Sequence, residues 1–355
     1  MSGSAARFWA PTGLELLTDP VERAEGPPEA LADVLARVEA TPGRWAGWVA
    51  ADGRSRFTRY GRSGPAGPAI GAEPPKAGPV TVSLDRAGYE AAVEQVLAAI
   101  GRGDCYQVNV CIRFEVEDVG VAAADLWHAL VARLRPPFAG LLDDPDHQVA
   151  SVSPERFLEV DGRRVLTSPI KGTRPRGAGP AEDARLAAEL AADPKELAEN
   201  VMIVDLLRND LGRVARLGSV RPAGLFEVET FPHLHHLVSN VEAELAPGNG
   251  LPELFAATFP PGSVTGAPKL AALERIAALE PVPRGVSMGT VGWVASTGDP
   301  ATLRARFGVA IRTVELRGDR AWFCAGAGIV ADSRPAAEHA EVELKAASLL
   351  EALGA

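Results

Sequence analysis

The sequence predicts an α+β fold for this chain of 355 residues. Short strand-like stretches alternate irregularly with helix-like ones, whereas a doubly wound parallel sheet would alternate them regularly. The chain shows no internal repeat. With 46% hydrophobic and 23% charged residues, its composition is that of a globular protein with enough apolar residues for a large core.

Hydrophobic periodicity places the main elements. RAGYEAAVEQVLAAIGRG (86–103) has apolar residues at helical spacing and predicts a helix ending near Arg102. CYQVNVCIRFEVE (105–117) alternates as a strand does, and RFLEVDGRRVLTSPI (156–170) predicts a hairpin turning at Asp161 and Gly162. AWFCAGAGIVADS (321–333) predicts a buried strand, followed by a closing helix with Ser333 as its N-cap.

Composition divides the chain into three parts. Residues 61–79, GRSGPAGPAIGAEPPKAGP, predict a linker or long surface loop because glycine, proline and alanine dominate there. Residues 1–60 predict a short N-terminal segment that packs on the main body, with a helix in PEALADVLARVEA and a strand in GRWAGWVAADG. Residues 80–355 are expected to form the catalytic body.

The net charge, the apolar runs and the cysteines indicate which binding partners and which cellular compartment to expect. A formal net charge of −10 argues against nucleic acid and anionic membranes, which attract basic surfaces. No run reaches about 18 apolar residues, and the N-terminus does not resemble a signal peptide. The three cysteines are odd in number and lack metal-ligand spacing, which predicts a reducing cytoplasm and buried thiols. From the charge and the short apolar runs we expect no nucleic-acid or membrane partner.

Three cations gather in the loop SPIKGTRPRG (168–177) of this acidic chain: Lys171, Arg174 and Arg176. A local concentration of positive charge suits a small anion. We therefore expect this loop to face an anionic ligand.

Two predicted helices each carry glutamates three residues apart on one face: Glu196 and Glu199 in one, Glu338 and Glu341 in the other. If the two helices converge, these hard oxygen ligands would suit Mg²⁺. The spacing equally fits a capping box between Asp193 and Glu196 and a surface ion pair between Glu341 and Lys345.

Two further motifs have simpler interpretations. FPPGSVTGAPK (259–269) is not a phosphate loop, because Pro268 precedes Lys269 and no Ser or Thr follows it. FPHLHHLVS places three histidines within four residues, but no second cluster of zinc ligands accompanies them.

Six segments, in this order, resemble the chorismate-utilising enzymes. They are GDCYQVN (103–109), SPERFL (153–158), PIKGTRPRG (169–177), ENVMIVDLLRNDLGRV (199–214), FPPGSVTGAPK (259–269) and AGAGIVADS (325–333). The resemblance runs from about residue 80 to the C-terminus and is nearest to the large components of aminodeoxychorismate synthases. The first 75 residues resemble only a shortened form of the family's N-terminal part.

The resemblance implies two facing antiparallel sheets with helices outside and an active site in the cleft between the halves. It implies a transaminase-class amidotransferase component that aminates chorismate, a dianion, to 4-amino-4-deoxychorismate. That product would serve 4-aminobenzoate synthesis, for folate or a secondary metabolite. Ammonia would come from a separate glutamine amidotransferase, since the chain shows no Cys, His and Glu set for glutamine hydrolysis.

The resemblance also implies the ligand contacts. Mg²⁺ would be held by Glu199 and Glu341, with Glu196 and Glu338 as neighbouring or water-mediated ligands. The expected substrate-binding positions are Gln107, Thr173, Gly266, Ala267, Lys269, Arg312, Gly328 and Lys345. Lys269 fits a structural ion pair equally well, and Arg312 fits a solvated charge on a strand.

Three residues are expected to be catalytic. Glu155 matches the general acid that protonates the departing hydroxyl, which requires a carboxyl group with a raised pKa. Lys171 matches a lysine nucleophile that attacks ring carbon 2 of the substrate. Relatives that make anthranilate commonly have alanine at this sequence position. Arg174 and Arg176 are expected to favour the neutral amine of Lys171. His236 matches a cleft histidine that positions the substrate or transfers a proton.

Each role has a plainer alternative. Glu155 could pair with Arg156 at the surface, and Lys171 could contact only a substrate carboxylate. Gln107 stands where relatives that add water have a lysine base, which favours an amine donor over hydration.

The sequence departs from the family pattern at two cleft positions. Ser287 replaces the usual tyrosine, and Ala327 replaces a glycine next to Gly328. The shortened N-terminal part is not expected to keep the family's tryptophan site. The alternatives are anthranilate synthase component I and, from another class, a catalytically silent chorismate-binding subunit.

Overall fold

A computed structural model describes residues 4–10, 13–65, 77–231 and 234–355. Its helices are α1 (Leu31–Ala40), α2 (Arg86–Gly101), α3 (Ala123–Leu134), α4 (Pro180–Ala192), α5 (Pro194–Gly212), α6 (Leu251–Thr258), α7 (Lys269–Leu279) and α8 (Pro335–Leu353), with short 3-10 turns η1 (Pro28–Ala30), η2 (Gly262–Val264) and η3 (Pro300–Thr302). The first nine strands are β1 (Ala5–Ala10), β2 (Gly13–Gly26), β3 (Gly43–Val49), β4 (Ser55–Pro65), β5 (Val80–Val82), β6 (Gln107–Val116), β7 (Phe138–Asp144), β8 (His147–Ser153) and β9 (Arg156–Asp161). The others are β10 (Arg164–Ser168), β11 (Ile170–Pro175), β12 (Arg221–Thr230), β13 (Leu234–Glu244), β14 (Gly266–Ala267), β15 (Thr290–Ser296), β16 (Arg304–Val309), β17 (Thr313–Arg317) and β18 (Arg320–Ile329).

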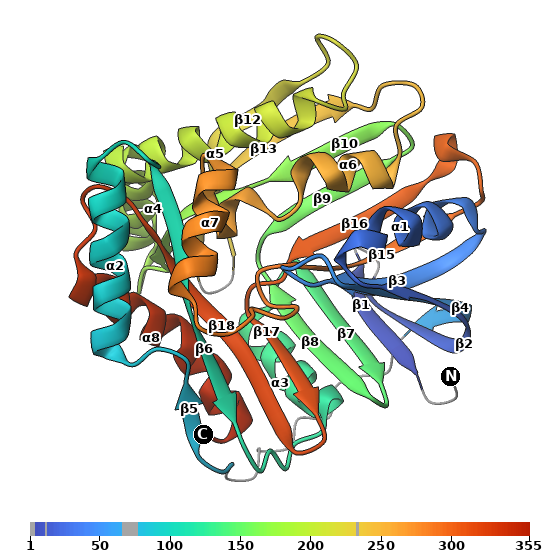
Figure 1. Ribbon diagram of the computed structural model, residues 1–355, viewed down its shortest axis with the longest axis horizontal. Helices are drawn as coiled ribbons and strands as arrows, with labels where there is room; N and C mark the ends of the chain where they lie inside the picture. Colours follow the sequence, from blue (N-terminus) through green and yellow to red (C-terminus); the bar gives the residue numbers. More distant parts are fainter. Residues whose placement is uncertain (1–3, 11–12, 66–76, 232–233) are drawn as a thin grey trace.

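The described strands form one antiparallel network with two halves (Figure 1). In the first half, β6 pairs with β18, β18 with β17, β17 with β8, and β8 with β7. In the second, β15 pairs with β16, β16 with β9, β9 with β10, and β13 lies between β10 and β12. The predicted α+β class is confirmed.

The N-terminal strands join the two halves. β1 pairs with β7 of the first half, and β3 pairs with β15 of the second, while β2 and β4 complete the path between them. The two sheets expected to face each other are therefore linked by continuous hydrogen bonding through the N-terminal segment.

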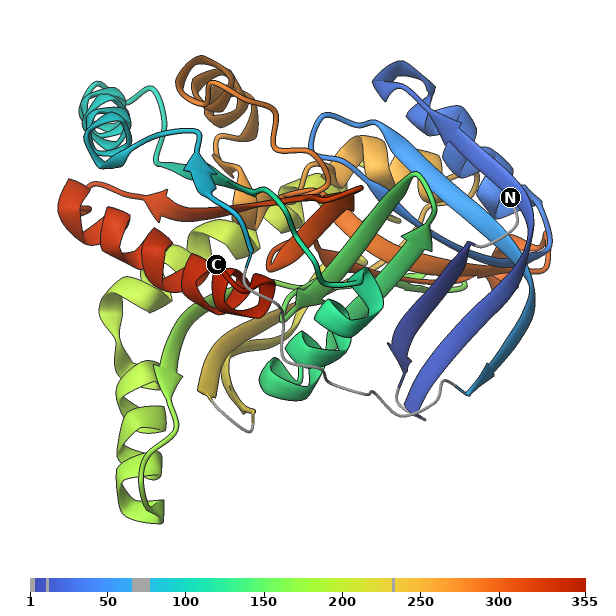
Figure 2. The same ribbon diagram turned by 90° about the horizontal axis from the view of Figure 1, so that it is seen from below.

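Each half has its own apolar core because its helices cover the outer face of its strands. The first core combines α2, α3 and α8 with β6, β8 and β18, around Tyr89, Trp127 and Phe323. The second combines α1, α5 and α6 with β9, β13 and β16, around Phe255 and Phe307. Figure 2 shows α4 projecting from this body.

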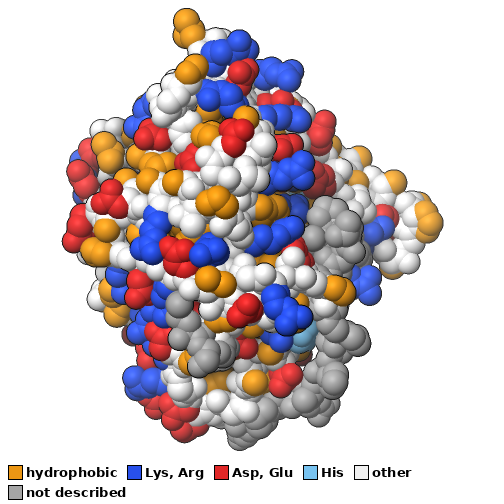
Figure 3. Space-filling model, turned by 90° about the vertical axis from the view of Figure 1, so that its right-hand side faces the viewer, with side chains coloured by type: hydrophobic (Ala, Val, Ile, Leu, Met, Phe, Trp, Pro, Cys, Tyr) orange, Lys and Arg blue, Asp and Glu red, His pale blue; other side chains and the backbone are white. Residues whose placement is uncertain are grey.

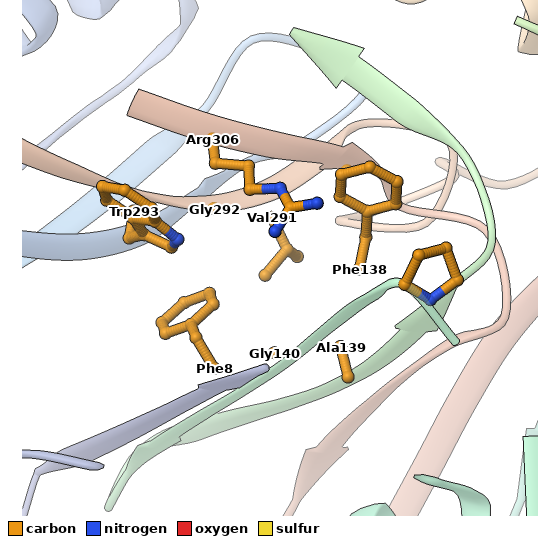
Figure 4. A pocket seen from close by; sticks show the side chains of 10 residues that line it. Phe8, Phe138, Ala139, Gly140, Val291, Gly292, Trp293 and Arg306 are labelled. Atoms are coloured by element: carbon orange, nitrogen blue, oxygen red, sulfur yellow. The ribbon is translucent and has the colours of Figure 1, made fainter. Parts of the chain in front are cut away.

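The junction between the halves contains a small pocket (Figure 4). Phe8 of β1, Phe138 of β7 and Trp293 of β15 line it, and the guanidinium of Arg306 lies 4.6 Å from the centre of the Phe138 ring. None of the predicted site residues lines this pocket. Figure 3 shows acidic and basic side chains interspersed on the face that carries the N-terminal strands, where Arg56 pairs with Glu25 and Arg59 with Glu22.

Several local predictions are confirmed. α2 ends with Arg102 as its C-cap, β9 and β10 form the hairpin, and Gly162 at its turn has a φ of 59°. Asp193 caps α5 as expected, accepting hydrogen bonds from the backbone N–H groups of Lys195 and Glu196.

Two local predictions are wrong. The N-cap of α8 is Arg334, because the Ser333 hydroxyl instead accepts a hydrogen bond from the Val330 N–H. Residues 61–65 of the expected linker belong to β4, where they pair with β2 in spite of their glycine and proline content. Residues 66–76 of that linker lie outside the described residues.

No helix among the described residues is long and apolar enough to cross a membrane. Cys105, Cys111 and Cys324 are buried free thiols.

Candidate active site

The predicted catalytic residues come from the second half, and predicted substrate-binding residues of the first half lie beside them. The first half contributes Gln107 at the start of β6 and Gly328 near the end of β18. The second contributes Glu155 just before β9, Lys171 on β11 and His236 on β13.

Lys171 lies between the two halves. Its ammonium is 3.6 Å from the Glu199 carboxylate, and its side chain is only 13% exposed. A methyl group added at Gly328 would lie 3.5 Å from the Lys171 Nζ and 2.4 Å from the Gln107 Nε2. A side chain at position 328 would therefore displace the Gln107 amide, whereas its distance to the Lys171 amine would be an ordinary contact.

Gln107 is fully buried, and neither its amide nitrogen nor its amide oxygen has a hydrogen-bond partner among the described residues. Buried polar atoms are normally paired, since leaving one unpaired costs about 1–3 kcal/mol. The amide beside Lys171 is therefore available to a polar ligand.

Glu155 has the protonation behaviour expected of a general acid. Burial raises the pKa of its carboxyl group to about 7, although the Lys171 charge and hydrogen bonds from the Ser263 hydroxyl and the Ile170 backbone oppose this rise. The alternative of a surface pair with Arg156 is not what the structure shows, since Arg156 pairs with Glu159.

His236 and Arg312 line a second hollow together with Pro154 and Phe231. Burial and the Arg312 charge lower the pKa of His236 to about 4, so its ring is neutral at neutral pH. The His236 Nδ1 lies 2.9 Å from the Thr173 hydroxyl.

Arg312 has no carboxylate partner among the described residues, and burial lowers its pKa. Its φ of 48° is uncommon for a residue other than glycine. A partly buried guanidinium that lines a hollow and has no carboxylate partner among the described residues favours an anionic ligand there.

Arg174 and Arg176 do not have the role expected from the sequence. Arg174 donates to Asp193 at 2.7 Å, and Arg176 donates to both oxygens of Asp183 at 2.7 Å. Acidic partners in α4 and at the start of α5 thus neutralise both arginines. Their expected influence on the protonation of Lys171 loses its basis, because the ion partner of Lys171 is the opposite charge of Glu199.

The four glutamates expected to hold Mg²⁺ lie in the N-terminal halves of α5 and α8. Burial and the neighbouring Glu199 raise the pKa of Glu196, and burial raises the pKa of Glu338 with Glu341 adding to the effect. The charge of Lys195 on α5 opposes the rise in the pKa of Glu338 on α8.

The chemistry of this donor set fits a hard divalent cation, since carboxylates crowded together are stabilised by one. The side chains are nevertheless not gathered around a point. Among the described residues, no three acidic, histidine or cysteine side chains are placed to hold one metal ion. Glu199 is engaged by Lys171, and Glu341 accepts from Lys345 at 2.7 Å.

The other residues expected to bind the substrate differ in whether they already have partners within the protein. Lys269 forms the structural ion pair that the sequence left open, because its ammonium lies 2.6 Å from both the Asp210 carboxylate and the Thr258 carbonyl. Lys345 donates to the Gly326 carbonyl at 2.9 Å. Gly266 and Ala267 form β14, which pairs with Val108 and Gln107 at the start of β6.

The two departures from the family pattern have structural explanations. Ala327 is 1% exposed and belongs to the first core, so it lies on the opposite face of β18 from Gly328. The buried Ser287 hydroxyl donates to the Thr313 carbonyl and accepts from the Cys324 N–H. This hydroxyl links its loop to β17 and β18.

The histidine cluster does not form a metal site among the described residues. His235 is buried between Asp183 and Thr230, whereas His236 faces Thr173 on β11. His233 lies outside the described residues.

Sequence reasoning missed Ser263, whose hydroxyl contacts the Glu155 carboxyl. The signal was present, since Ser263 stands inside the quoted motif FPPGSVTGAPK. Motif matching alone does not show which of its polar side chains reaches the general acid.

A family model described as chorismate binding enzyme matches residues 38–351. The chain therefore belongs to the chorismate binding enzyme family. This agrees with the two-half fold and with the unpaired polar groups between the halves.

Two curated relatives show how similar the chain is to individual proteins in sequence. The chain is 39% identical over 281 residues to aminodeoxychorismate synthase component 1 of Bacillus subtilis (strain 168), which covers 79% of this chain and 58% of the relative. It is 43% identical over 272 residues to anthranilate synthase component 1 of Thermus thermophilus, covering 76% of this chain and 57% of the relative. These matches span little more than half the length of the curated relatives.

Among solved structures, the chain is similar to anthranilate synthase component I from Streptococcus pneumoniae TIGR4. The TM-score is 0.82 with 26% sequence identity, and the match covers 97% of this chain and 92% of that one.

Proposed function

We propose that the chain aminates chorismate with ammonia at ring carbon 4, as an aminodeoxychorismate synthase component I would. The observation that supports this most directly is the position of Lys171. Its amine lies between the halves, near the general acid Glu155 and beside the unpaired amide of Gln107. A nucleophile, an acid and a polar anchor are the groups that a substitution of this kind needs.

The proposed reaction has two substitution steps. The Lys171 amine attacks carbon 2, the ring double bond shifts, and the carbon 4 hydroxyl leaves as water with the proton of Glu155. Ammonia then attacks carbon 4, the double bond shifts back, and the bond from carbon 2 to Lys171 breaks with release of the neutral lysine amine. The Glu155 carboxylate takes one proton from the new ammonium group at carbon 4, which restores the acid. The first step requires Glu155 to be protonated, which its raised pKa of about 7 provides near neutral pH.

Substrate binding follows from the charges in the cleft. The unpaired guanidinium of Arg312 would bind one carboxylate of chorismate, with the neutral His236 beside it. Gln107 would hydrogen-bond the incoming nucleophile or the ring substituents.

Mg²⁺ would be held by Glu199 and Glu341, with Glu196 and Glu338 beside them, and would neutralise the other carboxylate of the substrate. Holding it requires Glu199 to exchange its contact with Lys171, and Glu341 its contact with Lys345, for the cation.

The remaining assignments belong to the same proposal. Residues 80–355 form the catalytic domain, with the N-terminal segment packed on it. A separate glutamine amidotransferase supplies the ammonia, and three free buried cysteines suit a cytoplasmic location.

Anthranilate synthesis is the second candidate, because relatives with that name are as similar in sequence. Lys171 argues against it, since the lysine would direct amination to carbon 4. A silent binding subunit is less well supported, because Glu155 and Gln107 keep the polar environment of a working site.

The test is incubation of the purified chain with chorismate, Mg²⁺ and an ammonium salt, with products identified by mass and ultraviolet absorbance. An aminated product that retains the pyruvyl group supports the proposal. Fluorescent anthranilate would establish the second candidate, and unchanged chorismate would contradict both.

A further inference from the structure

A buried ion pair next to the candidate active site has no role in the proposed reaction. Glu280, which follows α7, and Arg284 are 6% and 7% exposed and make a two-pronged contact. The Arg284 Nη2 lies 2.6 Å from the Glu280 Oε1, and the Arg284 Nε lies 2.7 Å from the Glu280 Oε2. The nearby thiol of Cys111 is neutral, since burial raises its pKa to about 12.

This pair holds two backbone segments of the active site together. The guanidinium of Arg284 donates to the Val264 carbonyl and to the Asn109 carbonyl, each at 2.7 Å. The carboxylate of Glu280 accepts from the Cys111 N–H at 2.9 Å. Asn109 and Cys111 belong to β6, whereas Val264 belongs to η2, so the pair ties β6 to η2.

Both segments carry active-site groups close to these contacts. Ser263 precedes Val264, and its hydroxyl is one of the neighbours that lower the pKa of the Glu155 carboxyl group. Gln107 lies two residues before Asn109, and its backbone faces Gly266 so closely that a methyl group there would lie 2.1 Å from the Gln107 carbonyl oxygen. A small shift between β6 and η2 would therefore move both groups.

Stability alone does not account for such a pair. Replacing a buried ion pair with apolar residues of similar volume is often neutral or stabilising, because desolvation offsets the attraction. What apolar residues cannot supply is a set of directed hydrogen bonds to two backbone carbonyls and one N–H.

We propose that Glu280 and Arg284 are positioning residues: their ion pair fixes η2 against β6, and so sets Ser263 against Glu155 and Gln107 against Lys171. This inference rests on the proposed function for its catalytic consequence. Its geometric part does not, because the Ser263 contact to Glu155 can be measured without turnover.

The test uses a double variant, Glu280→Leu with Arg284→Met, which removes both charges together. Two smaller changes accompany it. Arg284→Lys keeps the charge, but a lysine cannot reach both carbonyls while it pairs with Glu280. Ser263→Ala removes only the hydroxyl group next to Glu155. The matched control is Arg23→Met with Asp144→Leu, which removes an ion pair between β2 and β7.

The primary measurement is the pH titration of the Glu155 carboxyl, followed by difference infrared spectroscopy with Glu155→Gln as the blank. Lys171 is the charged group facing Glu155 and is unchanged in every variant. Losing the Ser263 hydrogen bond should raise the Glu155 pKa by about one pH unit in the double variant and in Ser263→Ala. The control should titrate as the original protein does.

The second measurement is turnover of chorismate with Mg²⁺ and ammonium. Mispositioning should lower kcat at least about tenfold with a smaller change in KM, since a displacement of about 1 Å can cost a hundredfold. A double variant that folds and keeps both the original Glu155 titration and kcat would overturn the inference. If it fails to fold, the same two readouts in Arg284→Lys and Ser263→Ala decide the question.

The two proposals fail in different ways. If the original protein leaves chorismate unchanged, the proposed function is wrong, yet the titration still tests the link from Arg284 to Glu155. If the protein turns over chorismate but no variant shifts the titration or kcat, only the positioning role is wrong.

Discussion

Lys171 and Glu155 show how burial changes the properties of single charged residues. Both carry charges that normally prefer water, yet Lys171 is 13% exposed and Glu155 is 6% exposed. Burial raises the pKa of Glu155 to about 7, which makes its carboxyl a proton donor at neutral pH. The contact between Lys171 and Glu199 holds the amine between the two halves.

Lys171→Ala should lower formation of the 4-amino product by about a thousandfold or more, because it removes the amine that we propose as the nucleophile. Product formation is measured with chorismate, Mg²⁺ and ammonium. Lys195→Ala is the matched control, since Lys195 also approaches Glu199, at 3.9 Å, but is 57% exposed. Equal rates for both variants would rule out a covalent role for Lys171.

Glu155→Gln should abolish turnover and stabilise the fold at high pH. The folded pKa of about 7 lies above the ordinary value of 4.5, so the stability that the protonated form provides is complete below about pH 4.5 and is lost as pH rises through 7. Glutamine cannot ionise, and the variant should gain on the order of 2–3 kcal/mol over the original protein by pH 8. Urea unfolding at pH 5 and pH 8 measures this gain.

The comparison is Glu159, which lies on the following strand β9 and has a side chain that is 40% exposed. Glu159→Gln should show no such gain with pH. A Glu155→Gln variant that is no more stable at pH 8 than at pH 5, relative to the original protein, would contradict the raised pKa.

At the scale of elements, α4, α5 and β11 are joined by ion pairs that orient the Lys171 strand. Arg174 of β11 pairs with Asp193 at the start of α5, and Arg176 pairs with Asp183 of α4. His235 on β13 also contacts Asp183. The cations next to Lys171 thus hold its strand against two helices.

Asp193→Ala should lower the free energy of unfolding by about 1–2 kcal/mol, because α5 loses its N-cap and Arg174 loses its partner. Asp193→Asn keeps a capping oxygen and should lose less. Urea unfolding of both variants at neutral pH measures the difference. Equal losses would assign the stabilisation to the ion pair alone.

At the scale of the whole molecule, the N-terminal strands keep the two halves in register. β3 is central because it pairs with β15 on one side and β4 on the other. A methyl group at Gly47 of β3 would lie 2.1 Å from the Arg56 carbonyl oxygen and 2.6 Å from the Phe57 ring. Close packing at this position therefore depends on glycine.

Gly47→Val should lower the free energy of unfolding by at least about 2 kcal/mol and reduce turnover, since overpacking β3 disturbs the link between the halves. Thermal unfolding and the amination assay measure the two effects. Gly64→Ala on β4 is the control, because nothing lies within 4 Å of the added methyl group. Full activity in a destabilised Gly47→Val protein would show that the cleft does not depend on this link.

Local pattern and motif order predicted much of the fold and many of the candidate residues. The helix from Arg86, the hairpin at Gly162 and the Asp193 cap follow from periodicity and capping, which act over a few residues. Motif order also indicated the family, and Glu155 and Lys171 within it.

Only the tertiary structure decided which charged side chains pair with each other and which residues leave space for a distant neighbour. Arg174 and Arg176 proved to be neutralised by acidic partners, and Lys269 proved to be paired with Asp210. Ala327 faces a core, while Gly328 leaves room for Gln107 and Lys171. These outcomes depend on contacts between segments that lie far apart in the sequence. Burial determines how strongly each charged group interacts with its neighbours and how much space lies beside it. Sequence spacing predicts which side chains are available, whereas packing decides which of them remain free for a ligand.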